Sequence, residues 1–372
     1  MNSTHTKDAV LAIGPLPPPI HGYSLITSLV IERLKRAGPV AVVDIAPQNL
    51  ARGWLYHWTR MRRAAAALWA LLRRPARGRT LYLAIAGGAG VLYDILFAAA
   101  ARLRGYRIFI HHNAFTYLTR RSRGTALVVA LAGAESTHIC LCPTMARRLR
   151  EQYPRVQRAV VLSNAALVAP ASVTDQTRAG GFRVGFLSNL IPEKGLDTAI
   201  ATLAALSAQH ADVMLVVAGP IVGAAMQQII DAARRRFGDA FDYRGAVYGA
   251  EKTRFFHDID VLLFPSRYPN EAQPLVVLEA LAHGVPVIAT ARGCIPDDLT
   301  RGGIVVYPES AFVDAAVAAI MDWRADPPAF SRSRGVAHEC SVAMHRAAAG
   351  DLDRLIGVMS AAAEAGWEAA GR

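Results

Sequence analysis

Residues 270–286, NEAQPLVVLEALAHGVP, decide the fold because they carry two glutamates across the junction between a loop and a helix. The preceding residues 260–266 are an apolar run of strand length that ends in Pro-Ser, and residues 285–290 have the composition of another buried strand. Glu271 lies in the loop before the helix, and Glu279 lies about a turn and a half inside it. The stretch therefore predicts a strand–loop–helix–strand unit of an α/β domain.

The ends of this helix carry residue types that suit helix termini. Pro274 fits the first helical turn, where its missing N–H would have no partner, and Gly284 ends the helix. Free amides at a helix N-terminus bind anions, and carboxylates accept hydrogen bonds from hydroxyl groups. A sugar nucleotide requires an acceptor for its ribose diol, amides for its phosphates and a polar anchor for its sugar. The segment offers all three.

The rest of the chain repeats the alternation of strand, loop and helix, which is typical of doubly wound α/β domains. The length of 372 residues fits two domains, and 53% hydrophobic with 19% charged residues favours large cores. Residues 169–181 (APASVTDQTRAGG) interrupt the alternation and are interpreted as a linker. We expect two Rossmann-like domains, 1–170 and 182–340, that face an interdomain cleft. A C-terminal helical segment, 341–372, could pack back on the first domain.

Six strands are predicted in the first domain and three more before residue 260 in the second. They lie at residues 10–13, 40–45, 81–86, 107–111, 139–142, 160–162, 182–187, 213–218 and 241–243. Helices are predicted at 23–36, 93–104, 195–208, 224–237 and 250–258.

The positive charge of the chain is concentrated in its first half. Residues 1–180 contain 24 basic and 7 acidic residues, whereas the whole chain has a net charge of +12. Nucleic acid, an anionic membrane surface or an acidic substrate could account for this bias. Residues 58–79 form a basic amphipathic candidate that resembles an interfacial helix, with Leu68, Trp69, Leu71 and Leu72 on its apolar side. An ordinary surface helix with arginines over apolar neighbours is the alternative. We favour the membrane, because no nucleic-acid module is recognisable.

Two loops follow strands and precede helices. Residues 14–22 (GPLPPPIHG) form a stiff loop that lacks the G-x-G-x-x-G dinucleotide fingerprint, and Gly22 precedes a helix whose amides could face a ligand. Residues 186–195 occupy the matching loop of the second domain. Lys194 in that loop is one of four lysines beside 37 arginines, which favours a compact charge for a phosphate. A rigid connector and a solvated lysine are the alternatives.

The strand at residues 107–111 ends in His111, followed by His112, at a carboxyl end where catalytic groups of open sheets collect. Successive strand residues point to opposite faces, so only one histidine is expected to face the cleft, and we favour His111. His257-Asp258-Ile259-Asp260 could suggest an Asp-x-Asp metal site, but capping carboxylates fit a helix–strand junction better, and Asp297-Asp298 is interpreted likewise. We expect no essential metal and no cofactor.

The order of these segments resembles the retaining glycosyltransferase family 4, of GT-B architecture. The resemblance covers nearly the whole chain and depends most on Glu271, Glu279 and the following EALAxGxP. Its other elements are the glycine loop 14–22, Glu193-Lys194-Gly195, Val217-Ala218-Gly219-Pro220 and Phe264-Pro265-Ser266.

The resemblance implies a role for each motif residue. It makes the first domain the acceptor side and the second the nucleotide-sugar domain. Glu279 would bind the donor ribose, Lys194 the diphosphate, and Glu271 would lie beside the donor sugar near the amides of Gln273, Pro274 and Leu275. His111 would stand near the reaction centre, and Gly22 near the phosphates and acceptor. Relatives often carry a basic residue where this chain has Asn189, so the leaving diphosphate would depend more on Lys194 and on helix amides.

The resemblance thus implies a metal-independent, retaining transfer from a nucleoside diphosphate sugar, with UDP-sugars favoured and GDP-mannose next. A glycan or lipid-linked acceptor of surface polysaccharide assembly is expected, with peripheral contact to an anionic membrane and no nucleic acid. The N-terminal residues 1–8 lack the order of a signal peptide, so we expect a cytoplasmic enzyme at the inner face of the cell membrane. A sugar-nucleotide epimerase or hydrolase, or a non-enzymatic basic binding protein, are the alternatives.

Overall fold

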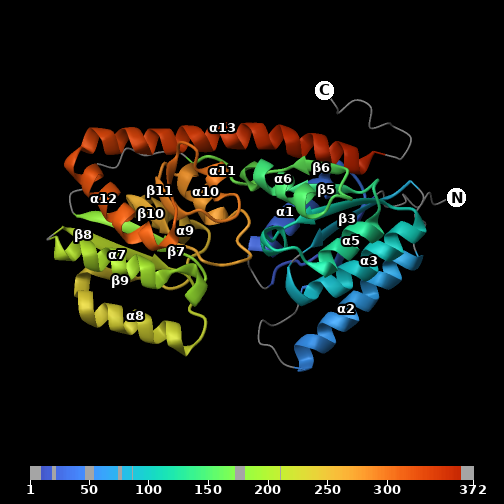
Figure 1. Cartoon of the computed structure of the whole chain (residues 1–372), viewed down its shortest axis with the longest axis horizontal. Coiled ribbons are helices and arrows are strands. Elements are labelled where there is room, and N and C mark those ends of the chain that lie inside the picture. Colours follow the sequence, from blue (N-terminus) through green and yellow to red (C-terminus); the bar gives the residue numbers. More distant parts are fainter. Residues whose placement is uncertain are drawn as a thin grey trace. The chain divides into compact units, whose positions relative to one another are not determined.

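A computed structural model describes residues 10–18, 22–46, 54–73, 78–85, 87–171, 181–209 and 211–361, with the side chains of 54–57 and 89 excepted. The chain divides into two compact units (Figure 1). The first unit consists of Met1–Leu167 and Ala347–Arg372, and the second of Val168–Arg346. Most of the predicted linker, 172–180, lies outside the described residues, as do residues 19–21 of the proline-rich loop.

The first unit is built on a six-stranded parallel sheet in the order β2-β1-β3-β4-β5-β6. β1 and β3 are buried along their whole length, as expected for strands with helices on both faces. The strands are β1 (Val10–Gly14), β2 (Val40–Asp44), β3 (Thr80–Ile85), β4 (Arg107–His112), β5 (Thr137–Cys140) and β6 (Arg158–Val161). The helices are α1 (Gly22–Ala37), α2 (Trp54–Arg73), α3 (Val91–Arg104), α4 (Thr116–Thr119), α5 (Arg123–Ala132) and α6 (Pro143–Gln152).

The second unit repeats the architecture with the strand order β12-β11-β10-β7-β8-β9, again all parallel. Its strands are β7 (Phe182–Leu187), β8 (Val213–Ala218), β9 (Phe241–Tyr243), β10 (Val261–Phe264), β11 (Val287–Thr290) and β12 (Gly303–Val306). Its helices are α7 (Leu196–Ala208), α8 (Ala224–Phe237), α9 (Ala250–Asp258), α10 (Leu275–Ala282), α11 (Ile295–Asp298) and α12 (Phe312–Ala325). The prediction of two doubly wound α/β domains is confirmed.

The strand orders fix where each sheet can bind a ligand. The chain leaves β1 for β2 on one side and then returns to place β3 on the other side of β1. It likewise leaves β7 for β8 and β9, and then crosses over to β10. Ligands of open α/β sheets bind at the carboxyl ends of the two strands where this direction reverses. The site of the second unit is therefore expected in the loops that follow β7 and β10.

The last helix, α13 (Pro327–Ser360), contributes residues to both units. Within the first unit, the guanidinium of Arg107 on β4 donates hydrogen bonds to the carbonyl oxygens of Val358 (3.0 Å) and Ala361 (2.9 Å). These bonds satisfy carbonyl groups that a helix C-terminus leaves without an intrahelical partner. Among the described helices, none is both long and apolar enough to cross a bilayer.

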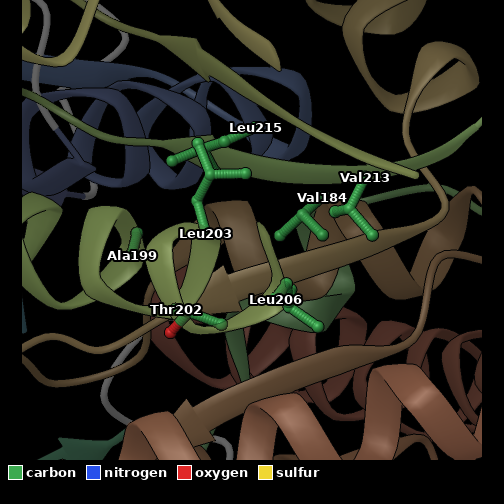
Figure 2. A pocket seen from close by; sticks show the side chains of 7 residues that line it. All are labelled: Val184, Ala199, Thr202, Leu203, Leu206, Val213 and Leu215. Atoms are coloured by element: carbon green, nitrogen blue, oxygen red, sulfur yellow. The ribbon is translucent and has the colours of Figure 1, made fainter. Parts of the chain in front are cut away.

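A small gap in the core of the second unit is no candidate for a ligand site (Figure 2). Its only hydroxyl belongs to Thr202, which donates to the carbonyl oxygen of Thr198 within α7 (3.0 Å). Val184 and Val213 line it from the amino-terminal parts of β7 and β8, away from the carboxyl ends of those strands. The remaining lining residues are Ala199, Leu203, Leu206 and Leu215.

Several predicted boundaries need correction by one or two residues, among them those at Pro274, at Gly22 and at the end of β5. Pro274 is the residue before α10 and is not in its first turn, while Gly22 is the first residue of α1 and does not precede it. β5 ends at Cys140, two residues before the predicted end, because Cys142 caps α6 by accepting from the amide of Met145. A residue that caps a helix has extended backbone of its own, which makes it look like strand in sequence.

Candidate active site

The loops after β7 and β10 are fastened to each other. The amide of Arg267 donates to the carbonyl oxygen of Glu193 (2.7 Å), which joins the two loops through their backbones. Gly195 has a positive φ of 82°, and a Cβ there would lie 2.2 Å from the carbonyl oxygen of Pro265. Glycine is the residue that permits both this backbone conformation and this approach. Lys194 is thereby held against the loop that carries Glu271.

Lys194 and Glu271 form an ion pair at the expected switch point. Lys194 Nζ lies 2.6 Å from Glu271 Oε2, and the two side chains are only 15% and 9% exposed. Ser266 donates to the same carboxylate oxygen at 2.7 Å, and Thr290 on β11 donates to the carbonyl oxygen of Ser266 at 2.7 Å. The carboxylate is therefore fixed by a charged and a neutral donor, which come from the loops after β7 and β10.

The ammonium group of Lys194 also lies over aromatic rings. Its Nζ is 4.9 Å from the ring centre of Tyr268 and 5.6 Å from that of Phe264, within the range of cation–π attraction. An ammonium group has three N–H donors, and Glu271 is its one hydrogen-bond acceptor in the described part of the chain. The remaining donors can bind an anionic ligand.

The second glutamate of the motif is paired with a lysine that the sequence analysis missed. Glu279 on α10 accepts from Lys252 on α9, with Nζ 2.7 Å from Oε1 and 2.5 Å from Oε2. Lys252 is another of the four lysines, so the rarity that pointed to Lys194 also applied to it. Each motif glutamate thus holds one of the four lysines of the chain.

The loop between the glutamates is hydrogen-bonded to α11 and to Cys294, the residue before this helix. Gln273 donates to Asp298 Oδ1 at 2.7 Å, and both side chains are buried. Burial raises the pKa of Asp298 to about 7, and the nearby Asp297 adds to the rise while the bond from Gln273 opposes it. The amide of Cys294 donates to the carbonyl oxygen of Ala272 at 2.7 Å. These bonds orient Gln273 towards Asp298, although the resemblance places it near the donor sugar.

The other residues named from the resemblance occupy the following positions. Pro274 caps α10 in an extended conformation, and Leu275 begins the helix, whose first amides lack intrahelical partners. Asn189 is exposed in the loop after β7, and no hydrogen bond among the described residues joins its side chain to Lys194. Gly22 is exposed in the first unit, with open space where a Cβ would stand.

In the first unit, the two adjacent histidines differ in their partners. His111 is 1% exposed, its Nδ1 lies 2.7 Å from the hydroxyl of Tyr82, and its buried Nε2 makes no hydrogen bond with the described residues. Burial lowers the pKa of His111 to about 4, so the ring is neutral near pH 7.

His112 belongs to a hydrogen-bonded chain on the opposite face of the sheet. Its Nδ1 lies 3.0 Å from the hydroxyl of Tyr117, and its Nε2 lies 2.9 Å from Nδ1 of His138. His138 Nε2 lies 3.2 Å from the hydroxyl oxygen of Ser136, which donates to the carbonyl oxygen of Gly133. Both ring nitrogens of His112 are occupied, which favours His111 as the histidine that meets a ligand.

The acidic residues considered for a metal have other partners. Asp258 pairs with Arg244 (2.7 Å), and Asp260 accepts from the backbone amide of Arg183 (2.7 Å). Within the described part of the chain, no three His, Cys, Asp or Glu side chains are grouped in a way that could hold a metal ion.

Known proteins resemble this chain in sequence over much of its second unit and in fold over nearly its whole length. Residues 181–323 match the family described as Glycosyl transferases group 1, so the second unit carries a group 1 glycosyltransferase domain. The structure resembles that of Anabaena Alr3699/HepE in complex with UDP-glucose, with a TM-score of 0.71, 15% identity, and coverage of 94% of this chain and 99% of that one. The chain has the GT-B fold.

Two curated relatives have similar sequences. The glycogen synthase of Mycobacterium tuberculosis strain H37Rv is 31% identical over 166 residues, which are 44% of this chain and 38% of that protein. The GDP-mannose-dependent alpha-(1-6)-phosphatidylinositol monomannoside mannosyltransferase of Mycolicibacterium smegmatis is 28% identical over 284 residues, 71% of this chain and 66% of that protein. The matches thus span less than two thirds of either relative.

Proposed function

We propose that the protein is a retaining, metal-independent glycosyltransferase that moves a sugar from a nucleoside diphosphate sugar to a glycan or lipid-linked acceptor in surface polysaccharide assembly. The observation that carries the proposal is the Lys194–Glu271 pair at the carboxyl ends of β7 and β10, the strands between which the sheet reverses direction. Among donors, a UDP-sugar is favoured and GDP-mannose is next.

The proposed roles follow from the chemistry of each side chain. The free N–H donors of Lys194 bind the diphosphate, together with the first amides of α10. Glu279, with Lys252 holding its carboxylate in place, accepts hydrogen bonds from the ribose hydroxyls. Glu271 fixes Lys194 and lies beside the donor sugar.

In the proposed reaction the bond between the anomeric carbon and the diphosphate oxygen breaks, and a bond from the acceptor oxygen forms on the same face. The acceptor proton passes to the departing phosphate, so no protein base is required. Lys194 stabilises the negative charge that develops on that phosphate. Charge stabilisation by a preorganised donor is often the largest single contribution to catalysis.

The two kinds of relative support different parts of the proposal. The structural neighbour binds UDP-glucose, which is the favoured class of donor. The mycobacterial mannosyltransferase uses GDP-mannose and acts on a phosphatidylinositol-linked acceptor, as its name states. A lipid-linked acceptor suits an enzyme that works at a membrane surface.

Product analysis with a labelled donor tests the transferase against its enzymatic alternatives. We expect stoichiometric transfer only when an acceptor is present, retention at the anomeric carbon, and full activity in EDTA. Release of free sugar or conversion of the donor sugar without acceptor would instead identify a hydrolase or an epimerase. Activity lost in EDTA and restored by Mg²⁺ or Mn²⁺ would contradict metal independence.

We propose further that α2, α3 and α5 form the surface that contacts the membrane. Eight of the eleven exposed large hydrophobic side chains of the described residues belong to these helices, and α3 packs against both of the others (Figure 1). Large apolar patches on the surface of a monomeric protein mark sites that bind a partner or a membrane. The eight residues, here called the apolar face, are Trp58, Met61, Trp69, Leu72, Leu92, Leu96, Leu103 and Leu127.

Helix α2 is apolar on two opposite sides. At 100° per residue, its four exposed large hydrophobic residues fall within an arc of about 80°, and Ala67 and Leu71 face the interior on the other side. Leu71 was expected on the interfacial side, so the sequence-based assignment was wrong for this residue. Arg73 lies over the ring of the exposed Trp69, 4.7 Å from its centre, as in helices that lie at a membrane interface.

The charge around the apolar face favours an anionic bilayer. Residues 54–132, which include all three helices, contain thirteen arginines, no lysine and one acidic residue, the buried Asp94. Each basic side chain near an anionic surface contributes about 1 kcal/mol to binding. Apolar side chains flanked by arginines combine insertion between lipids with attraction to their headgroups.

Flotation with vesicles tests this surface. We expect the protein to float with vesicles of phosphatidylcholine and phosphatidylglycerol but not with phosphatidylcholine alone, and Trp58→Ser with Trp69→Ser to reduce the bound fraction severalfold. The matched control is Val222→Ser with Tyr248→Ser, which removes two exposed apolar side chains of the second unit. Equal flotation of both double variants, or binding to RNA in place of vesicles, would refute the assignment.

A further inference from the structure

One nitrogen of His111 is set apart from the other ring nitrogens of the buried histidines. Nε2 of His111 is enclosed in the first unit without a hydrogen-bond partner among the described residues. A buried polar atom without a partner destabilises a fold, so such atoms are rare and often have a functional explanation. The question is whether this nitrogen carries a proton.

The hydroxyl of Tyr82 determines which ring nitrogen of His111 carries the proton. Tyr82 is fully buried, and Nδ1 of His111 at 2.7 Å is its one hydrogen-bond partner in the described part of the chain. Burial raises the pKa of Tyr82, so the hydroxyl keeps its proton. That proton has one acceptor to go to, Nδ1 of His111. A neutral imidazole carries a single proton, which must then be on Nε2.

The opposite tautomer leaves two groups unsatisfied. If Nδ1 carried the proton and donated it to Tyr82, the O–H of Tyr82 would be buried with no acceptor among the described residues, and Nε2 would be buried as an unused acceptor. Each such loss destabilises the folded state. The Nε2–H tautomer leaves a single donor unpaired.

We propose that Tyr82 is a positioning residue that holds His111 as the Nε2–H tautomer, so that His111 donates this proton in a hydrogen bond to an oxygen of the substrate. The inference depends on the proposed function, because it takes His111 to act on the transferred sugar or its acceptor. Tyr82 itself touches no substrate and acts through His111.

The strands β3 and β4 fix the positions of the side chains of Tyr82 and His111. His111 is opposite Ala84 in the register of β3 and β4, and Tyr82 precedes Ala84 by two residues, so both rings are on the same face of the sheet. The hydroxyl of Tyr23 on α1 donates to the carbonyl oxygen of Ala84 at 2.5 Å, which ties the helix to this part of β3. The rings of Tyr82 and His111 meet edge to face, 5.9 Å apart.

His112 supplies a matched comparison within the same strand. The hydroxyl of Tyr117 lies 3.0 Å from Nδ1 of His112, as that of Tyr82 does from Nδ1 of His111, but Nε2 of His112 is bonded to His138. Removing either tyrosine hydroxyl takes one hydrogen bond from a buried histidine. Only the loss at Tyr82 affects a histidine with a free donor.

Long-range ¹H–¹⁵N spectra of the full-length protein with ring-labelled histidines test the tautomer without any substrate. We expect the His111 signals, assigned by their loss in His111→Asn, to show a protonated Nε2 and an unprotonated Nδ1 in the wild type. Tyr82→Phe should move the chemical shifts of both ring nitrogens towards the average of the two neutral tautomers. A protonated Nδ1 in the wild type would overturn the inference, even if the variant failed to fold.

Transfer kinetics complete the test. We expect Tyr82→Phe to lower kcat roughly three- to tenfold, the effect of one misplaced hydrogen bond, with the donor KM unchanged within a factor of about two. Tyr117→Phe should leave kcat unchanged. Equal kcat values for Tyr82→Phe and the wild type would overturn the positioning role. The spectra measure the tautomer without substrate. A missing Nε2–H tautomer can therefore be distinguished from a failure of the proposed transferase activity.

Discussion

Among single residues, Lys194 is the one whose substitution is expected to lower the rate of transfer most. If it stabilises the departing diphosphate, Lys194→Ala should lower kcat by about a hundred- to a thousandfold, since preorganised charge at a developing anion contributes that much. Steady-state kinetics with saturating donor measures this loss. Lys35→Ala is the matched control, because Lys35 is an exposed lysine in the last turn of α1. A near-normal kcat for Lys194→Ala would remove the residue from the mechanism.

The sequence analysis selected Lys194, Glu271 and Glu279, but it did not indicate their pairing. Glu271 and Glu279 were identified by spacing, and Lys194 by its position after a strand. That Lys194 binds Glu271, and Lys252 binds Glu279, depends on the crossover that puts β10 beside β7 and on the packing of α9 near α10. Such contacts between residues 27 or 77 positions apart leave no local pattern in the chain.

At the scale of elements, the approach of two loops depends on Gly195. Gly195→Ala would require an unfavourable positive φ and would put Cβ 2.2 Å from the carbonyl oxygen of Pro265. We expect this variant to lose about 1 to 3 kcal/mol in the free energy of unfolding, measured in urea, and to lose activity as the Lys194 loop shifts.

Gly350→Ala is the matched control for Gly195→Ala. Gly350 lies inside α13 and has open space where a Cβ would stand, so alanine should raise the free energy of unfolding by about 0.5 to 1 kcal/mol. Two variants of equal stability would show that the approach of the two loops does not require glycine.

The alternation of elements was predictable because buried parallel strands and amphipathic helices have different periodicities. The strands from Val10 to Ala218 are within two residues of their predicted bounds. Helix α2 was harder, because it is apolar on both sides and periodicity alone cannot tell which side packs inward. Leu71 was therefore assigned to the wrong side, and the exposed row on α3 was not recognised.

At the scale of the whole molecule, stability should depend on pH through buried carboxyl groups. Burial raises the pKa of Asp94 to about 8, although the charge of Arg60 opposes the rise. The folded state therefore holds this proton more tightly than the unfolded state, and its contribution to stability is lost as pH rises from about 4 through 8. We expect Asp94→Asn to reduce the fall in Tm between pH 7 and 9.

Asp239→Asn, at an exposed aspartate of the second unit, is the control for this measurement and should leave the fall unchanged. Towards acidic pH, the contribution of the buried His111 and His138 to stability changes in the opposite direction to that of Asp94. Burial lowers the pKa of each to about 4, so the stability they contribute above pH 6.5 is lost as pH falls through 4. A Tm of Asp94→Asn that falls as steeply as the wild type above pH 7 would contradict the assignment of Asp94.

Binding of a nucleoside diphosphate sugar by Glu279 and Lys194 is the claim on which the proposed function depends. Calorimetric titration of the wild-type protein and Glu279→Ala with UDP-glucose, GDP-mannose and UDP measures it most directly. We expect the wild type to bind a nucleoside diphosphate sugar, and Glu279→Ala to bind it at least about tenfold more weakly, the effect of losing a charged acceptor for the ribose hydroxyls. The same affinity in both proteins, or no binding of any of these ligands to the wild type, would contradict the account.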